Sequence, residues 1–222
     1  MNSVTRKLIA KELHVNRLIV VGAAAGGVLS ILIAALGKAG FSVGSLMWLT
    51  TIIANGVMLA LYGVMNERKE RSLLFVLSLP LSIADYVRAK MLGLALCFFL
   101  PWLVASVAAI VLVLVKDDVP DGLVPYTVLL SVYMLANFLV LLCWTLHVNS
   151  EGWISAAIVL TNMGVSIYMF VVGAQPGLQK YIYSPTPVWN QTAWTILAVE
   201  LGVIALAFAL PFFLAARRRD FI

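Results

Sequence analysis

Charged side chains are scarce in this sequence. Lys, Arg, Asp and Glu together make up 11% of the 222 residues, and 63% of the residues are hydrophobic. An ordinary soluble domain carries about 25% charged residues. We therefore predict that the chain is an integral membrane protein.

Cysteine and histidine are also rare, with two residues of each. Cys97 and Cys143 fall within long apolar runs, where they act as small apolar residues, so no disulfide framework or metal knuckle is expected. His14 and His147 stand far apart in the chain, whereas a metal site needs several converging ligands. We expect no metal site and no metal-binding residue.

A phosphate-binding loop is missing as well. Such a loop needs Gly, four residues, and then Gly-Lys-Ser or Gly-Lys-Thr. Gly22 and Gly27 have the spacing, but Val28 follows where Lys is required. An intramembrane enzyme would need a nucleophile with a base, or a metal cluster, and neither pattern occurs. We expect no catalytic and no cofactor-binding residue in this chain, so any ATP is hydrolysed on another polypeptide.

Long apolar runs, by contrast, recur along the whole length. A helix needs about 20 predominantly apolar residues to cross the hydrocarbon core of a bilayer. The sequence predicts one all-α transmembrane domain over residues 1–222, with six spans at 18–36, 46–65, 91–115, 123–146, 152–172 and 193–215. These spans leave no room for a soluble catalytic domain.

The basic residues predict the orientation of the spans, because short loops rich in Lys and Arg stay in the cytoplasm. Six spans place both termini on one side, and that side carries twelve of the fifteen basic residues. The opposite side carries only Lys38, Lys116 and Lys180. We predict that both termini are cytoplasmic and that the net charge of +5 faces anionic lipid, not nucleic acid.

Residues 4–17 predict a basic amphipathic helix ahead of the first span, lying in the membrane interface. Its apolar positions are Val4, Leu8, Ile9 and Leu13, and its basic positions include Arg6, Lys7 and Lys11. A solvated leader that only orients the first span is the alternative, since the apolar face is narrow. In the first span, Gly22, Gly26 and Gly27 form a small-residue surface that could pack within one subunit or between two.

Residues 66–90, between the second and third spans, form the longest polar segment, yet its centre is rich in leucine. Glu67 and Arg71 have the spacing of a helical ion pair, and Pro80 would end that helix. Ser82 with Asp85 fits a capping box that begins a new helix into the third span. The segment predicts a short cytoplasmic helix, a sharp turn and a re-entry into the membrane.

This segment resembles a known family at the level of motif. It reads Glu67-Arg68-Lys69-Glu70-Arg71-Ser72-Leu73-Leu74, then Leu77-Ser78-Leu79-Pro80-Leu81-Ser82, then Asp85-Tyr86-Val87-Arg88-Ala89-Lys90. An acidic start, a Leu-rich helix, a Leu-Pro-Leu-Ser-like turn and a closing Lys after the second span are similar to the type-2 membrane subunits of ATP-binding-cassette transporters. The six-span plan and the Arg-rich end at residues 217–219 agree at lower specificity.

The resemblance implies a permease subunit of an exporter in the plasma or bacterial inner membrane. It implies a second membrane subunit, identical or homologous, and separate ATPase subunits that carry ATP and Mg. The helix after the second span would be a coupling helix that sits in a groove of the ATPase. The match carries this role onto Glu67, Arg68, Glu70, Arg71, Leu73, Leu74, Leu77 and Pro80.

Glu200 is the one acidic residue well inside a predicted span. An ionisable group in hydrocarbon is costly and is a functional candidate by default. It is a candidate for substrate passage or ion contact, and hydrogen bonding between subunits or snorkelling to the interface would explain it equally well. The few charges favour an amphipathic or hydrophobic cargo such as a lipid, peptide or drug-like molecule. An ATP-independent carrier or a membrane scaffold is the alternative function, although we see no internal repeat of the kind carriers show.

Overall fold

The computed structural model describes residues 3–69, 83–148 and 150–217, and its regular elements there are all helical. Within these ranges, six helices are long and apolar enough to cross a membrane, as the sequence predicts. They are α2 (Arg17–Ala34), α3 (Gly37–Ala60) continued by the π-helical turn η1 (Leu61–Met65), α6 (Ile83–Val115), α7 (Val124–His147), α8 (Glu151–Gly173) and α10 (Gln191–Arg217). The shorter elements are α1 (Ser3–Val15), α4 (Asn66–Lys69), the 3-10 turn η2 (Asp121–Leu123) and α9 (Pro176–Gln179).

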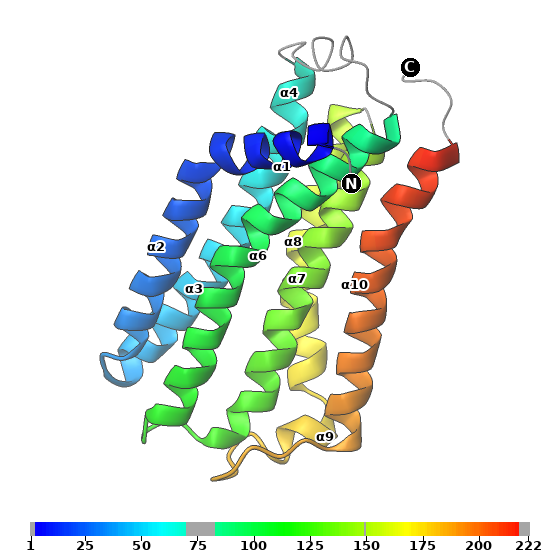
Figure 1. The fold of residues 1–222 in the computed structure, drawn as a ribbon. Helices are drawn as coiled ribbons and strands as arrows, with labels where there is room; N and C mark the ends of the chain where they lie inside the picture. The colour runs from blue at the N-terminus through cyan, green and yellow to red at the C-terminus, as the bar shows by residue number, and fades with distance from the viewer. Residues whose placement is uncertain (1–2, 70–82, 149, 218–222) are drawn as a thin grey trace.

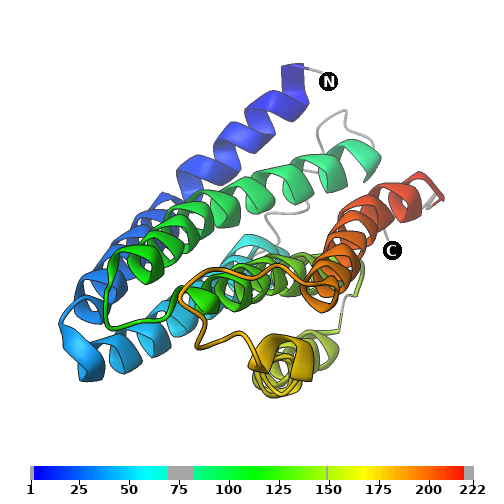
Figure 2. The ribbon, with the colours of Figure 1, turned by 90° about the horizontal axis from the view of Figure 1, so that it is seen from below.

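The long helices run side by side, and α1 crosses one end of the bundle close to α4 and to the beginning of α6 (Figure 1). We call this end the inner end, because the basic residues predict that it is cytoplasmic, and the opposite end the outer end. In the view along the bundle, α7 lies in the middle and α8 at the edge (Figure 2). Most residues of α7 are buried, whereas at most 17% of the apolar window of α2, α8 or α10 is buried.

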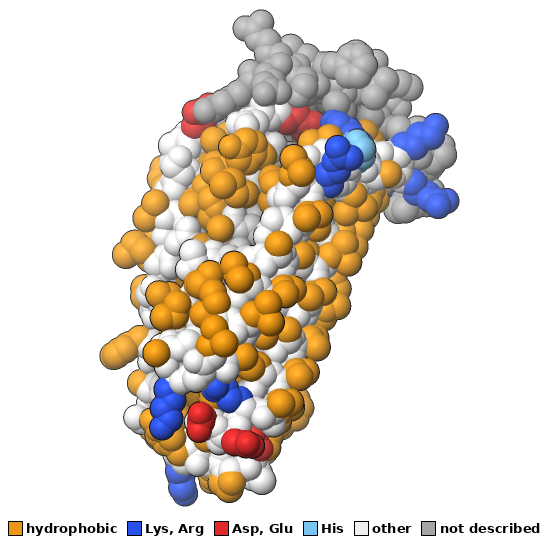
Figure 3. All heavy atoms as spheres, turned by 90° about the vertical axis from the view of Figure 1, so that its left-hand side faces the viewer, with side chains coloured by type: hydrophobic (Ala, Val, Ile, Leu, Met, Phe, Trp, Pro, Cys, Tyr) orange, Lys and Arg blue, Asp and Glu red, His pale blue; other side chains and the backbone are white. Residues whose placement is uncertain are grey.

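The charges are separated along the bundle. On the face drawn in Figure 3, hydrophobic side chains cover the middle, and the charged side chains gather towards the two ends. An apolar belt of this kind is what a surface in contact with hydrocarbon requires, because an uncompensated charge at mid-depth is costly. The six spans and this belt make the chain a multi-pass membrane protein.

One boundary differs from the prediction. Residues 37–45 were expected to connect the first two spans, but α3 already begins at Gly37 and only two residues separate it from α2. Gly37 has a φ of +94°, a conformation that costs glycine little, so the chain reverses there within a very short turn. A side chain on Gly40 or Gly44 would collide with the backbone of α2, so these two glycines let the hairpin close.

Small residues and aromatic anchors fix the centre of the bundle. A Cβ on Gly26 would lie 2.9 Å from Thr51 Cγ2, and one on Gly27 would lie 3.0 Å from Ala105 Cβ. These two glycines therefore pack α2 against α3 and α6 within the subunit, whereas Gly22 has no atom within 4 Å of such a Cβ.

The interface of α6 and α7 is aromatic. The rings of Phe98 and Phe138 stack with centroids 4.0 Å apart, and Trp102 Nε1 donates to the carbonyl of Ser131 at 2.8 Å. The indole of Trp48 on α3 donates to the carbonyl of Ala105 at 3.2 Å, which joins α3 to α6. Buried indole N–H groups that reach backbone carbonyls fix the rotation of each helix about its axis.

The outer end is closed by an ordered segment between α8 and α10. Leu178 of α9 is buried, and the N–H of Gly122 donates to the carbonyl of Ser184 at 2.9 Å. Asn190 Oδ1 accepts from the N–H of Ala193 at 2.9 Å, a side-chain cap for the start of α10. This segment holds the outer end of α10 in place beside α7 and α8.

Candidate functional site

Four charged side chains meet at the inner end, where α1, α4 and α6 converge. Lys90 Nζ lies 2.8 Å from Glu12 Oε1 and 2.6 Å from Glu67 Oε2, and Lys11 Nζ lies 2.9 Å from Glu67 Oε1. Lys90, Glu12 and Glu67 are each at most 9% exposed, whereas the Lys11 side chain is 43% exposed. We call Lys11, Glu12, Glu67 and Lys90 the ion cluster.

Hydrogen bonds complete the ion cluster. Lys90 Nζ also donates to the carbonyl of Gly63 at 2.7 Å, and Tyr86 Oη donates to Glu67 Oε2 at 3.1 Å. An ammonium group has three N–H donors, and the two carboxylates and this carbonyl provide three acceptors. A buried charge is tolerated when it is paired and hydrogen-bonded in this way.

Two glycines make room for the ion cluster. A Cβ on Gly63 would lie 2.6 Å from Leu94 Cδ2, and one on Gly93 would lie 2.7 Å from the Cβ of Glu12. Glycine at these positions therefore lets the end of α3 and the helix α1 approach α6 closely. Gly63 also lies within the π-helical turn η1, a local helix distortion that occurs frequently at functional sites.

The sequence did not predict the ion cluster. The helix predicted from Ser82 into the third span is present as α6, but Lys90 was expected only to orient the spans, and it is 4% exposed. Glu12 is the single acidic residue of α1 and was overlooked within a basic helix. Lys90 stands where α6 becomes continuously apolar, and a lysine buried at such a position needs a carboxylate partner, which was the available signal.

The helix predicted over residues 4–17 is present as α1. The ion cluster determines which side of α1 packs against the bundle. Arg6, Lys7 and Lys11 are exposed, whereas Glu12 and Asn16 are buried against the bundle. Asn16 Nδ2 donates to the backbone carbonyl of Glu12 at 2.9 Å. The docked face of α1 is therefore partly polar, and its placement in the membrane interface stays a prediction.

The predicted coupling residues divide into two groups. Glu67 lies in α4, and its carboxylate is occupied by Lys90, Lys11 and Tyr86. Arg68 also lies in α4, but its side chain falls outside the described part of the structure. The other predicted coupling residues lie outside the described residues: Glu70, Arg71, Leu73, Leu74, Leu77 and Pro80. The structure therefore places the beginning of the segment, and its contact with an ATPase stays a prediction.

The ion cluster changes the titration of Glu67. Burial on its own raises the pKa of this carboxyl, but the nearby ammonium groups of Lys90 and Lys11 outweigh that effect and hold the pKa below its ordinary value. A carboxyl whose pKa is lower in the folded protein than in the unfolded chain stabilises the fold above its unfolded pKa. That stabilisation is lost as the pH falls through the folded pKa.

We expect acid to destabilise the protein partly through Glu67. The midpoint of thermal unfolding in detergent, followed by tryptophan fluorescence, should fall as the pH is lowered from about 7 to about 3. Glu67→Gln should flatten this dependence below the ordinary carboxyl pKa of 4.5, because the amide has no proton to gain. Asp118→Asn, at an exposed aspartate of the outer loop, is the matched control and should leave the slope unchanged. If the unfolding midpoint changed equally with pH in wild type and Glu67→Gln, Glu67 would not contribute to the acid destabilisation.

A second polar group lies within the spans. Glu200 of α10 is 5% exposed, and its Oε1 accepts a hydrogen bond from the hydroxyl of Tyr168 on α8. The ring of Tyr168 stacks on that of Tyr133 of α7, with centroids 3.9 Å apart. Burial among α7, α8 and α10 argues against snorkelling. The sequence identified Glu200 as a candidate but gave no indication of its tyrosine partner.

Glu200 and these tyrosines line an open pocket of about 530 Å³ between α7, α8 and α10. We call it the Glu200 cavity. Its outer side faces the surroundings of the bundle, since Leu160 and Val199 are 66% and 62% exposed. Its other polar lining residues are Asn137, Thr161 and Thr195, and the rest of its wall is apolar. The cavity joins the only acid predicted inside a span to a space large enough for a small molecule.

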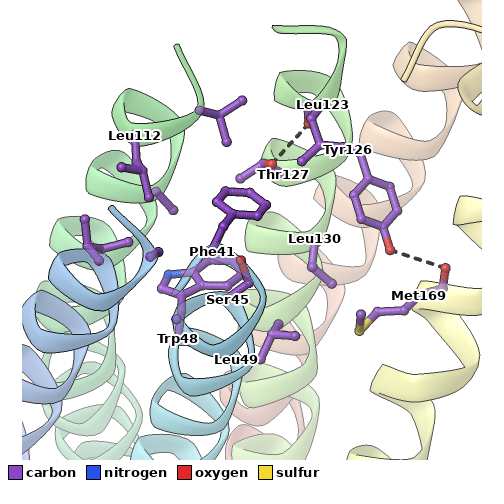
Figure 4. Close-up of a pocket in the computed structure, with 15 residues that line it drawn as sticks. Phe41, Ser45, Trp48, Leu49, Leu112, Leu123, Tyr126, Thr127, Leu130 and Met169 are labelled. Carbon is purple, nitrogen blue, oxygen red and sulfur yellow. Dashed lines mark hydrogen bonds between the residues drawn. The ribbon is translucent and has the colours of Figure 1, made fainter. Parts of the chain in front are cut away.

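A smaller cavity of about 210 Å³ lies near the outer end between α2, α3, α6 and α7 (Figure 4). Phe41, Trp48 and Leu130 contribute to its largely apolar wall. Two of its hydroxyl groups are occupied: Tyr126 Oη donates to the carbonyl of Met169 at 3.3 Å, and Thr127 Oγ1 donates to the carbonyl of Leu123 at 3.1 Å. This cavity has room for a hydrocarbon group, but no charged residue lines it.

Comparison with known proteins adds no relative. No family model matches the chain, and neither a curated protein nor a solved structure matches it. Among the residues that the structure describes, no group of three His, Cys, Asp or Glu side chains is placed to hold a metal ion. The family resemblance therefore rests on the segment at residues 67–90 and on the six-span plan.

Proposed function

We propose that this chain is the permease subunit of an ATP-driven exporter. Two such membrane subunits would form the translocation pathway, and separate cytoplasmic ATPase subunits would bind ATP and Mg and drive it. The cargo would be amphipathic or hydrophobic. The ion cluster is the observation that carries this proposal, together with the motif at residues 67–90.

The ion pair between Glu67 and Lys90 joins the two ends of the predicted coupling segment. Glu67 follows directly on the second span, and Lys90 lies in the helix that forms the third span. A segment held at both ends transmits a displacement to both spans together, because each end continues into rigid helix.

Helix α1 belongs to the same unit, because Glu12 binds Lys90 at 2.8 Å. If α1 or α4 moved away from α6, Lys90 would be left buried without its carboxylate partners, which is costly. We therefore expect α1, α4 and α6 to move together. A carrier or a scaffold does not require the ends of one inner loop to be joined by buried ion pairs. An ATPase that pushes on residues 67–79 does require them to be joined.

The proposal predicts that the tagged protein, purified in mild detergent from its native membrane, retains an ATPase subunit. Vesicles containing the pair should accumulate cargo only when ATP is present. Deleting residues 70–79 should abolish both results, whereas Asp117→Asn with Asp118→Asn at the exposed outer loop should change neither. Transport without ATP would indicate a carrier instead. Absence of transport with every partner present would indicate a scaffold.

A further inference from the structure

Only one of the two carboxyl oxygens of Glu200 has a hydrogen-bond partner among the described residues. Its Oε1 accepts from the Tyr168 hydroxyl, but no described residue donates a hydrogen bond to Oε2, which is fully buried. A buried carboxylate with a free acceptor is costly, and the cost is removed either by a proton on the carboxyl or by a donor or positive charge in the adjacent space. The adjacent space here is the Glu200 cavity.

None of the described residues supplies a cation for this carboxyl. No Lys or Arg lines the cavity. Over their described lengths, α7 and α8 contain no Lys or Arg, and α10 contains only Arg217 at its inner end. This distinguishes Glu200 from Glu12 and Glu67, which are both neutralised by lysine in the ion cluster.

The rest of the cavity selects among cations. A metal ion such as Ca²⁺ takes six to eight oxygen ligands, and this wall is mainly apolar. An organic cation whose charge is delocalised or alkylated fits better, because it has few or no N–H donors to satisfy and is also attracted to aromatic faces such as those of Tyr133 and Tyr168. The aliphatic wall, which includes Val199 and Val203, suits an apolar body attached to the cation. Its volume of about 530 Å³ is within the range of small-molecule sites.

We propose that the Glu200 cavity binds cationic amphiphiles: molecules with one ammonium-type or delocalised positive charge on an apolar body. The charge lies against the Glu200 carboxylate and the tyrosine rings, and the body lies along α8 and α10. This inference rests on the proposed function in one respect, since it makes the cargo of the exporter cationic. Binding itself requires neither ATP nor the ATPase.

Binding of rhodamine 6G, a fluorescent lipophilic cation, tests the proposal. The protein is placed in nanodiscs of phosphatidylcholine, a lipid without net charge, and fluorescence anisotropy is measured against protein concentration. Glu200→Gln should weaken the affinity at least about ten-fold, because it removes the only acidic group among the residues that line the cavity while keeping the size of the side chain. Glu151→Gln, at an exposed position outside the cavity, should bind like wild type. Nile red, an uncharged dye, should not discriminate between the variants.

A second variant keeps the test decisive if Glu200→Gln folds poorly. Val203→Trp retains the carboxylate and fills the cavity one helical turn away, so it should also weaken rhodamine 6G binding at least about ten-fold. Gel filtration and thermal unfolding establish that each variant is folded. Unchanged rhodamine 6G affinity in either folded variant would overturn the proposal.

Three further outcomes distinguish this inference from a subunit contact and from the permease assignment. Loss of dimers in Glu200→Gln with unchanged dye affinity would overturn it and assign the carboxyl to contact with a second subunit. Failure of dye binding in a protein that still copurifies with an active ATPase would overturn only the cationic cargo. Specific dye binding without any ATPase partner would support the site and count against the exporter.

Discussion

Lys90→Met is expected to lower the free energy of unfolding by about 3–5 kcal/mol. Methionine keeps the apolar stem of the side chain but leaves the carboxylates of Glu12 and Glu67 buried without their shared cation. The carbonyl of Gly63 loses a donor at the same time. Unfolding by sodium dodecyl sulfate, followed by tryptophan fluorescence, measures the change.

Two variants separate the buried charge from lost packing. Lys90→Met combined with Glu12→Gln and Glu67→Gln removes the uncompensated charges, so it should recover most of the lost stability. Lys11→Met is the matched single substitution, and it should cost less than about 1 kcal/mol because the Lys11 side chain is 43% exposed. Equal stability of Lys90→Met and wild type would show that the ion cluster has no structural role.

The expected recovery in the triple variant bears on why the ion cluster exists. A neutral, hydrogen-bonded substitute can be as stable as a buried ion pair, so stability alone does not require three charged residues here. Charges and directional hydrogen bonds do fix which part of α1 contacts which part of α6. An axial shift of either helix would leave a buried charge without its partner. We infer that the ion cluster sets the register between α1, α4 and α6 at the base of the predicted coupling segment.

The six spans could be predicted because each depends on a local property, about 20 apolar residues in succession. The start of α3 could not, because the sequence around Gly37 is neither strongly polar nor strongly apolar and a positive φ leaves no hydrophobic signal. The partners of Lys90 lie far away in the chain. Their pairing depends on how whole helices pack, which no periodicity in one helix reveals.

For Glu200, too, the sequence reveals the residue itself but not its partner in the folded protein. A lone acid in a span is visible in the sequence and marks a candidate site. Its partner Tyr168 is one of several tyrosines in the chain, and nothing local indicates which face of α8 turns towards α10. The absence of a cation on the three surrounding helices was visible in the sequence, but it acquires meaning only once those helices are known to be neighbours.

Replacing Leu73, Leu74 and Leu77 together by alanine is expected to lower ATP-driven transport at least about ten-fold. These leucines form the apolar centre of the predicted coupling helix, and truncating buried anchors of an interface removes most of its binding energy. ATP hydrolysis by the partner should persist without transport, since its nucleotide site lies on another chain. Transport and hydrolysis are measured in the same vesicles, so their ratio reports the coupling directly.

A matched triple variant distinguishes coupling from a general loss of leucine. Leu18, Leu29 and Leu32 are at least 51% exposed on α2, and their replacement by alanine should leave the ratio of transport to hydrolysis unchanged. Protein levels in the membrane should be equal for both triple variants, because the six apolar helices that drive insertion remain.

Ser78→Cys, in a background with Cys97→Ala and Cys143→Ala, should react with a membrane-impermeant maleimide only after the membrane is opened. Reaction from the outside of intact cells would place the segment on the wrong side for an ATPase, and undiminished transport in the Leu73, Leu74 and Leu77 variant would leave the coupling helix without a function.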